Sequence, residues 1–122
     1  MKLKILMFVV LAAIVGITIK SVAQDAAAPK DGKAIFLESK CINCHQISSL
    51  AIESKKKSGN IPDLSGVGLK RNADFIKKFI TKEEEIDGKK HAIAFKGEAA
   101  DLDMLAKWLE TLKTEVKKEE VK

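Results

Sequence analysis

Histidine and cysteine are scarce in this chain, which contains only two of each among its 122 residues. With His45 and His91 alone, the sequence offers no Ser–His–Asp catalytic set. No run of alternating polar and apolar residues indicates a β-strand, and no internal repeat is present. These absences favour a small all-α domain that is not an enzyme.

Long apolar runs are also lacking, with one exception near the N-terminus. The uncharged stretch from Ile5 to Ile19 is shorter than the roughly 20 residues that a membrane span needs. Lys2 and Lys4 precede it, and the small residues of 21–23 follow it, as in a secretory signal peptide cleaved before Gln24. An uncleaved membrane anchor at 1–23 is the alternative. In either case we expect the rest of the chain to lie outside the cytoplasm.

The charge balance sets a further limit. The net charge is +5, but residues 1–23 carry three of the 22 basic residues and none of the 17 acidic ones, so the remaining 99 residues carry +2. A nucleic-acid-binding protein needs a concentrated cationic surface, so we expect no nucleic-acid partner. The composition predicts a linker at 24–30, one domain with a thin core at 31–113, and a charged tail at 114–122.

The most specific motif spans residues 41–45, Cys-Ile-Asn-Cys-His. Two cysteines at this spacing, followed at once by histidine, form the attachment signature of a c-type haem. On a continuous helix, Cys41 and Cys44 would lie about one turn apart, where both sulfurs can form thioethers to one porphyrin. His45 can then bind the iron as the proximal axial ligand. The motif therefore predicts one covalent haem c with its iron.

Three other interpretations remain open for these residues. A redox-active dithiol also uses Cys-x-x-Cys, but it is expected after a strand. A zinc site would need both cysteines and both histidines, with the adjacent Cys44 and His45 at two corners of one tetrahedron. A plain disulfide leaves His45 unexplained. Haem attachment is the interpretation that uses all three residues.

Helical periodicity appears in three segments. Asp31 is expected to cap a helix that continues through Gly32, Phe36 and Leu37 into the motif. Periodicity is then lost over 46–71, which predicts an extended loop. A second helix is expected after the cap Asn72, with an apolar face of Phe75, Ile76, Phe79 and Ile80. A third is expected from near Glu98, with an apolar face of Leu102, Leu105, Trp108, Leu109 and Leu112.

The order of these stretches resembles a class I monohaem cytochrome c of the exported bacterial type. The resemblance rests on Gly32-x-x-x-Phe36, the motif at 41–45, Ile61-Pro62-Asp63-Leu64-Ser65-Gly66-Val67-Gly68, and Leu105-Ala106-Lys107-Trp108-Leu109. It covers 31–113 and implies a cytochrome c fold in which the first and last helices cross closely. Gly32 and Phe36 would then meet the face of Leu105, Trp108 and Leu109. The missing side chain of glycine allows such an approach.

The resemblance also assigns a role to Pro62. In the family, the carbonyl of this proline accepts a hydrogen bond from the proximal histidine, which would orient His45 and raise its basicity as an iron ligand. The simpler alternative is that Pro62 only stiffens a loop turn.

The sixth iron ligand is where the sequence departs from the family pattern. Most relatives use a methionine in the loop before the last helix. Beyond residue 23 the only methionine is Met104, which is expected inside that helix. The loop carries His91 instead, within Gly88-Lys89-Lys90-His91-Ala92. We therefore expect His91 as the distal ligand, with Met104 as the alternative and an open or externally filled site as a third possibility.

These features predict an electron carrier that transfers one electron at a time in a periplasmic or otherwise exported redox chain. Protein redox partners are expected, and Lys55, Lys56 and Lys57 offer a contact for an acidic one. We expect a monomer, with membrane contact only if the leader is retained. A haem-based sensor or ligand-binding module, and a haem subunit of a larger redox enzyme, are the alternatives.

Overall fold

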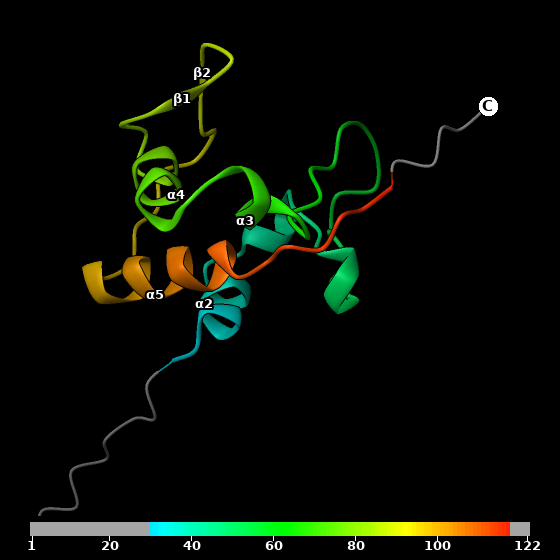
Figure 1. The fold of residues 1–122 in the computed structure, drawn as a ribbon, viewed down its shortest axis with the longest axis horizontal. Coiled ribbons are helices and arrows are strands. Elements are labelled where there is room, and N and C mark those ends of the chain that lie inside the picture. Colours follow the sequence, from blue (N-terminus) through cyan, green and yellow to red (C-terminus); the bar gives the residue numbers. More distant parts are fainter. Residues whose placement is uncertain (1–29, 118–122) are drawn as a thin grey trace, which may run out of the picture.

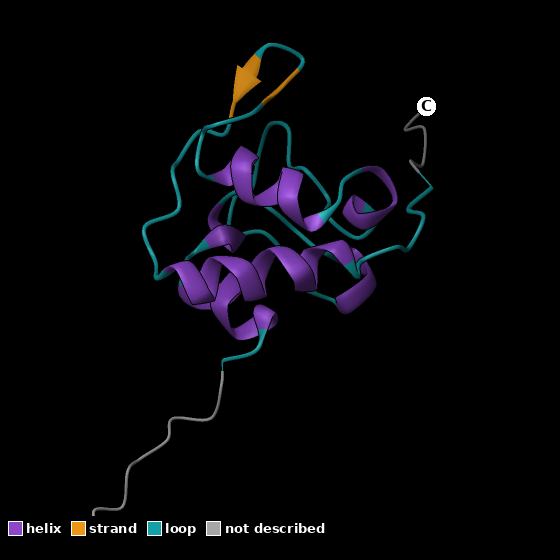
Figure 2. Cartoon of the chain, turned by 60° about the vertical axis from the view of Figure 1, so that its left-hand side comes forward, coloured by secondary structure: helices purple, strands orange, loops and turns teal. Residues whose placement is uncertain are grey.

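The computed structural model describes residues 30–117. The predicted leader at 1–23, the predicted linker apart from residue 30, and the end of the predicted tail lie outside this range. The described elements are α2 (Gly32–Glu38), the 3₁₀ turns η1 (Cys41–Asn43) and η2 (Ser48–Leu50), α3 (Val67–Lys70), α4 (Ala73–Ile80), β1 (Glu85–Ile86), β2 (Lys89–Lys90) and α5 (Ala99–Glu110). Figure 1 shows them in space, and Figure 2 shows that helices dominate.

Both predicted helix caps are confirmed. Asp31 Oδ1 accepts a hydrogen bond from the Ala34 amide at 2.7 Å, and Asn72 Oδ1 accepts one from the Phe75 amide at 2.9 Å. Each bond satisfies an amide that the first helical turn leaves free. The longest helix, α5, follows Glu98 as expected, although Glu98 makes no side-chain cap.

The first helix is shorter than predicted. It ends at Glu38, and Lys40 takes a left-handed conformation with φ of 60°. The prediction that this helix continues into the motif is therefore wrong. A left-handed residue cannot continue a right-handed helix, so Cys41 begins a separate 3₁₀ turn.

The predicted close crossing of α2 and α5 is confirmed (Figure 1). A Cβ built on Gly32 would lie 2.6 Å from Trp108 Cγ and 2.9 Å from the Met104 carbonyl oxygen. Only a glycine fits there, because real Cβ atoms do not approach other atoms so closely. Phe36, one turn further along α2, packs against Trp108 with ring centroids 5.8 Å apart.

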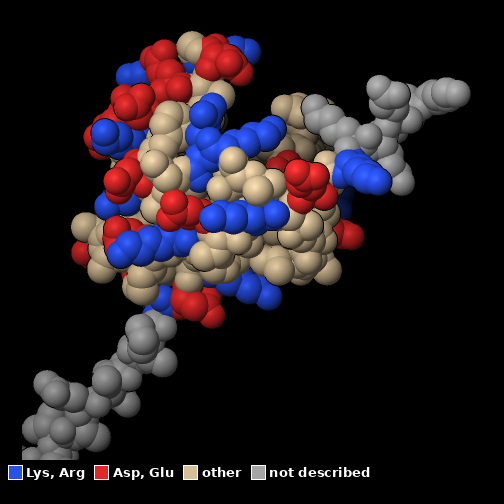
Figure 3. Space-filling view, viewed as in Figure 1, with Lys and Arg blue, Asp and Glu red and all other residues tan. Residues whose placement is uncertain are grey.

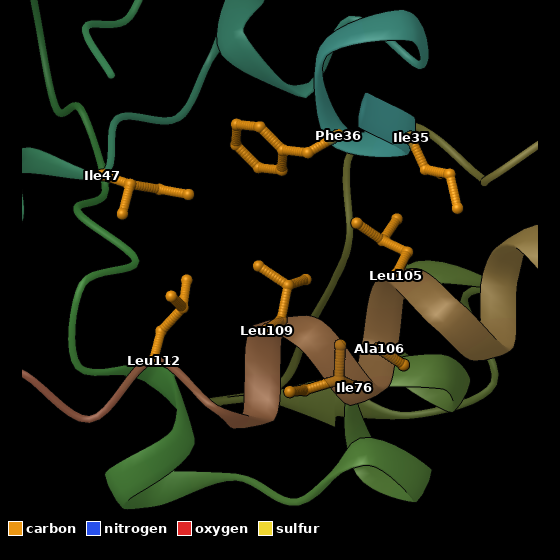
Figure 4. Close-up of a cluster of buried hydrophobic side chains, with 8 residues drawn as sticks. All are labelled: Ile35, Phe36, Ile47, Ile76, Leu105, Ala106, Leu109 and Leu112. Atoms are coloured by element: carbon orange, nitrogen blue, oxygen red, sulfur yellow. The ribbon is translucent and has the colours of Figure 1, made fainter. Parts of the chain in front are cut away.

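The hydrophobic core lies between these helices and the segments that flank them. Figure 4 shows its eight buried side chains: Ile35, Phe36, Ile47, Ile76, Leu105, Ala106, Leu109 and Leu112. Every α-helix within residues 30–117 except the short α3 contributes at least one of them. The core therefore fixes α2, α4 and α5 relative to one another.

The segment 46–71, predicted as an extended loop, contains η2 and α3. Gly68 in α3 donates its amide to the Leu112 carbonyl at 2.8 Å, and a Cβ there would lie 2.6 Å from the Glu110 carbonyl carbon. Thr114 donates its amide to the Ser65 carbonyl at 2.9 Å. Packing against the chain after α5 therefore orders a segment whose own sequence lacks periodicity. The bond from Thr114 shows that this packing includes the first residue of the predicted tail.

Asp63 joins the two ends of this segment through a group of hydrogen bonds that we call the Asp63 clasp, made by Asp63, Gln46, Ser48 and Ser65. Its carboxylate accepts from Gln46 Nε2 at 3.2 Å, from Ser65 Oγ at 2.6 Å, and from the amides of Ser65 and Ser48 at 2.9 and 3.4 Å. Burial acts to raise the pKa of Asp63, but these hydrogen bonds outweigh it and lower the pKa to about 2.

A small hairpin was not expected from the sequence. β1 and β2 pair antiparallel, with Glu85 opposite Lys90. Asp87 and Gly88 at its tip both have positive φ, 52° and 72°, as a type I′ turn requires. The hairpin projects from the end of α4 (Figure 1). None of the helices within 30–117 has the length and apolar character needed to cross a membrane.

Replacing Gly32 by alanine is expected to destabilise the protein by about 3 kcal/mol, because the added methyl group forces α2 and α5 apart. Urea unfolding of the holoprotein measures the loss. Lys33→Ala, an exposed neighbour on the same helix, is the control and should change the free energy of unfolding by less than about 0.5 kcal/mol. Equal stability of the two variants would show that the crossing is looser than described.

Asp63 is expected to make folding sensitive to strong acid. Its pKa is about 2 in the folded protein against an ordinary 3.8, so its stabilising contribution is complete above about pH 4 and is lost as the pH falls towards 2. Urea unfolding of wild type and Asp63→Asn at pH 7, 4 and 2.5 tests this. The difference in unfolding free energy between them should shrink below pH 4, and a constant difference contradicts the assignment.

Candidate functional site

The backbone of residues 40–45 brings Cys41, Cys44 and His45 together in one tight turn. The Cys41 carbonyl accepts hydrogen bonds from the amides of Cys44 and His45 at 3.1 and 3.0 Å. The left-handed Lys40 directs this turn away from α2. A 3₁₀ turn, rather than the expected α-helical turn, therefore groups the three residues of the motif.

The two cysteines are free thiols with different surroundings. Cys41 is half-buried and Cys44 is exposed. Burial raises the pKa of the Cys41 thiol to about 11, whereas a redox-active dithiol needs a lowered pKa. No three His, Cys, Asp or Glu side chains within 30–117 come together as metal ligands. The dithiol, disulfide and zinc interpretations thus receive no support from the geometry.

His45 is largely buried and is held as the neutral imidazole. Burial is the main cause that lowers its pKa; nearby His91 lowers it further, and the Pro62 carbonyl acts in the opposite direction. A neutral ring is the form that binds a metal ion. Among the described residues, His45 Nδ1 is the one buried side-chain nitrogen or oxygen without a hydrogen-bond partner.

Pro62 lies on the His45 side of the site, as the resemblance implies, and its carbonyl acts on His45 as a hydrogen-bond acceptor that raises the pKa of the ring. The same carbonyl accepts a hydrogen bond from the Gln46 amide at 3.2 Å, and Nδ1 has no partner that meets the full geometry of a hydrogen bond. The carbonyl therefore lies near the ring, and a well-formed bond from Nδ1 to Pro62 stays a prediction.

His91 lies next to His45, although the two are 46 positions apart in the sequence. Their ring centroids are 5.9 Å apart and their planes differ by 10°. His91 Nδ1 is hydrogen-bonded to the Ile93 carbonyl. A carbonyl oxygen can only accept, so Nδ1 carries the proton and the other ring nitrogen, Nε2, keeps its lone pair.

The hairpin and α4 together hold His91. It directly follows β2, and the loop beyond it returns to α4 through a hydrogen bond from the Phe95 amide to the Ile80 carbonyl at 2.9 Å. Phe79 of α4 meets the His91 ring edge-on, with centroids 5.4 Å apart. The side chain is thus positioned from two directions.

Met104, the alternative ligand, lies inside α5 and packs partly buried against the hydrophobic core. Its carbonyl is at the point where α5 meets Gly32. It therefore belongs to the contact between α2 and α5.

Phe79 and the Asp63 clasp belong to the surroundings of the site without being among the residues expected there. For Phe79, the sequence shows only an apolar helix face, which does not distinguish core from site. For Asp63, the order Asp-x-Ser after a proline is typical of a side chain that bonds the backbone two residues on. The Asp87-Gly88 pair, a strong hairpin signal, would have placed His91 just after a strand.

The residues of the motif fit a covalently attached haem. Two free thiols lie within one turn of each other, and a buried, neutral histidine follows them with an unpartnered ring nitrogen. Cys41 and Cys44 would hold the group through thioethers, and His45 would bind its iron.

A comparison with protein-family models matches the chain over residues 29–113, well over half of its length, to the family described as Cytochrome c. Neither the curated proteins nor the solved structures contain a significant match. The small, mostly helical domain with its four described helices is consistent with that fold. Together with the Cys41 and Cys44 pair, the family implies a covalent c-type haem and haem-based electron transfer, typically by a carrier that is not an enzyme. The chain belongs to the cytochrome c family.

Proposed function

We propose that this protein is a one-electron carrier whose single c-type haem iron is bound axially by His45 and His91, in a redox chain outside the cytoplasm. When bound, the haem supplies an Fe(III)/Fe(II) couple. The observation that carries the proposal is the nearly parallel pair of imidazole rings, 5.9 Å apart, at the end of the attachment motif.

The separation of the two rings supports a shared metal ion. Two metal–nitrogen bonds of about 2 Å each fit between two rings whose centroids are 5.9 Å apart. One ring, His45, is also desolvated by burial.

The hydrogen bond of His91 supports its role as a ligand. Histidines that bind metals almost always donate their second ring N–H to a carbonyl or carboxylate, which fixes the tautomer. His91 donates from Nδ1 to the Ile93 carbonyl, which leaves Nε2 as the ring nitrogen that can bind a metal ion. The edge of Phe79 restricts rotation of the ring.

The position of Met104 argues against the alternative ligand. A residue in the middle of α5, beside Gly32 and against the core, cannot leave that place without opening the helix contact. Two histidine ligands favour a lower reduction potential than histidine with methionine, because the thioether stabilises the reduced iron.

The residues of the chain have three tasks in this function. They attach the haem through Cys41 and Cys44, bind its iron from both sides, and keep water away from His45. No side chain has to accept or release a proton for an electron to pass. The described geometry therefore serves electron exchange rather than bond-making chemistry.

A lysine cluster beside the motif is a suitable contact for an acidic redox partner. Lys55 donates its amide to the Ile42 carbonyl at 2.7 Å, and Ser54 Oγ donates to the same carbonyl at 3.2 Å. Lys55, Lys56 and Lys57 are exposed, as is Cys44. Figure 3 shows acidic and basic side chains interspersed on the face that it views, without a continuous cationic region of the kind that nucleic acids bind.

The leader at 1–23 lies outside the described residues, and export is part of the proposal. Its supporting evidence is the apolar run at 5–19 with lysines before it and small residues after it. Retention of the leader would make the protein a membrane-anchored carrier, and cleavage a free monomer.

The ligand assignment predicts different spectra for two variants. The ferric holoprotein should be low-spin with two nitrogen ligands, and His91→Ala should become high-spin, because the sixth coordination position loses its donor. The reduced His91→Ala variant should also bind carbon monoxide readily, whereas the wild type should not. Electronic absorption and electron paramagnetic resonance spectra measure both effects.

Met104→Ala is the matched control, expected to keep the low-spin spectrum and to lose stability by about 2 kcal/mol through lost packing. If Met104→Ala rather than His91→Ala abolished the low-spin state, Met104 would be the ligand. Carbon monoxide binding by the wild type would favour a ligand-binding module. Absence of c-type bands from the reduced protein would refute haem attachment.

The partner contact predicts charge-dependent rates. Reversing Lys55, Lys56 and Lys57 to glutamate should slow oxidation of the ferrous protein by anionic hexacyanoferrate several-fold at low ionic strength, and added salt should remove the difference. Stopped-flow absorbance measures the rate. Reversal of the exposed Lys33, Lys113 and Lys117 changes the net charge equally. If both triple variants were slowed alike, the rate would depend on total charge and the contact would not be at 55–57.

A further inference from the structure

The Asp63 clasp lies directly beside the proximal histidine in the sequence and in space. Gln46, whose side chain donates to Asp63, is the residue after His45. Asp63 is the residue after Pro62, whose carbonyl acts on the His45 ring. The clasp therefore joins Gln46, next to His45, to Asp63, next to Pro62. The Asp63 carboxylate makes no bond to His45 or Pro62.

The backbone around the clasp sets a register between the two segments. The Gln46 amide donates to the Pro62 carbonyl at 3.2 Å, and the Leu64 amide donates to the Gln46 carbonyl at 2.9 Å. These two bonds form an isolated parallel bridge between Gln46 and Asp63. A shift by one residue would carry the Pro62 carbonyl away from His45. Two backbone bonds alone hold this register weakly. The carboxylate adds two more bonds between the segments, from Gln46 Nε2 and the Ser48 amide, and its two bonds from Ser65 order its own segment.

The clasp is partly protected from solvent, since Asp63 and Gln46 are half-buried and Ser48 is exposed. Ser65 is fully buried, and its hydroxyl is within hydrogen-bond distance of Asp63, of Ser48 Oγ at 3.2 Å and of the Ser49 amide at 3.0 Å. Hydrogen bonds to a charged acceptor are about twice as strong as neutral ones. The ordered carboxylate is therefore a fixed negative charge next to Pro62.

We propose that Asp63 is a positioning residue for the proximal ligand, which holds the Pro62 carbonyl beside the His45 ring and thereby lowers the reduction potential of the haem. The inference rests on the proposed function, since it needs His45 as an iron ligand. Asp63 is neither part of the attachment motif nor one of the two proposed axial ligands.

Asp63 is expected to lower the reduction potential in two ways. A carbonyl held near Nδ1–H makes His45 a stronger donor and stabilises the ferric iron. The fixed carboxylate also favours the state with the greater positive charge, which is again the ferric one. One electron enters the iron on reduction, and no bond at Asp63 forms or breaks. Loss of the clasp should therefore raise the potential.

The test compares Asp63→Asn with wild type as holoproteins. Asparagine keeps the size and one acceptor oxygen but loses the charge. At a fixed solution potential we expect its ratio of ferrous to ferric protein to rise roughly threefold or more, as measured by spectroelectrochemical titration. We also expect the His45 Nδ1 proton, observed by NMR in the reduced protein, to exchange faster with solvent, because the carbonyl that shields it is held less firmly.

Asp103→Asn is the control, because Asp103 pairs with Lys77 and Lys107 at 3.1 and 2.6 Å and makes no bond to the clasp. It loses the same charge, and we expect neither shift. Asp63→Glu retains the charge but displaces it by one methylene, so its potential should lie nearer to wild type while the proton still exchanges faster. It also provides a second variant if Asp63→Asn yields no holoprotein.

The inference is overturned if Asp63→Asn matches Asp103→Asn in both potential and proton exchange. It is also overturned if Asp63→Glu has the slow exchange of the wild type, since the clasp would then not position the carbonyl. Failure of the proposed function is distinct, because it removes the c-type bands or the low-spin spectrum from the wild type itself.

Discussion

The crossing of α2 and α5 at Gly32 is the constraint on which the rest of the structure depends. The attachment motif follows α2 within three residues, so the placement of that helix also places both thiols and the proximal histidine. The same α5 face buries Ile76 of α4 in the common core, and α4 in turn supports His91 through Phe79. Two histidines far apart in sequence thus meet because each is attached to a helix that packs on α5.

The two sides of the site are built by different means. On the His45 side, burial, a parallel bridge and a charged clasp give a rigid arrangement in which little can move. On the His91 side, a two-residue hairpin and one aromatic contact hold a half-exposed ring. Under the proposed assignment, the His45 side is suited to fixing the electronic character of a haem, and the His91 side to closing over it.

Sequence alone predicted the parts of this protein that depend on local chemistry. Asp31 and Asn72 cap helices because their side chains reach amides three residues further along the chain. The attachment motif is complete within five consecutive residues. The sequence did not predict the end of α2, because lysine has no preference for the left-handed conformation that Lys40 adopts. Nor did it predict α3, which forms because Gly68 fits against the chain after α5, a contact between residues more than 40 positions apart. Of the candidate site, the motif residues and His91 are brought together as expected, and the Pro62 carbonyl lies near the His45 ring while it also accepts a bond from the Gln46 amide.

The loop that carries His91 is closed at its base by a backbone hydrogen bond from the Phe95 amide to the Ile80 carbonyl, and the hairpin within it projects from the helical body (Figure 1). No residue of the hairpin belongs to the buried core that fixes the helices. A change of length or sequence in the hairpin is therefore expected to leave the helix crossings in place. One part of the domain sets the fold, and another supplies the residue that faces His45.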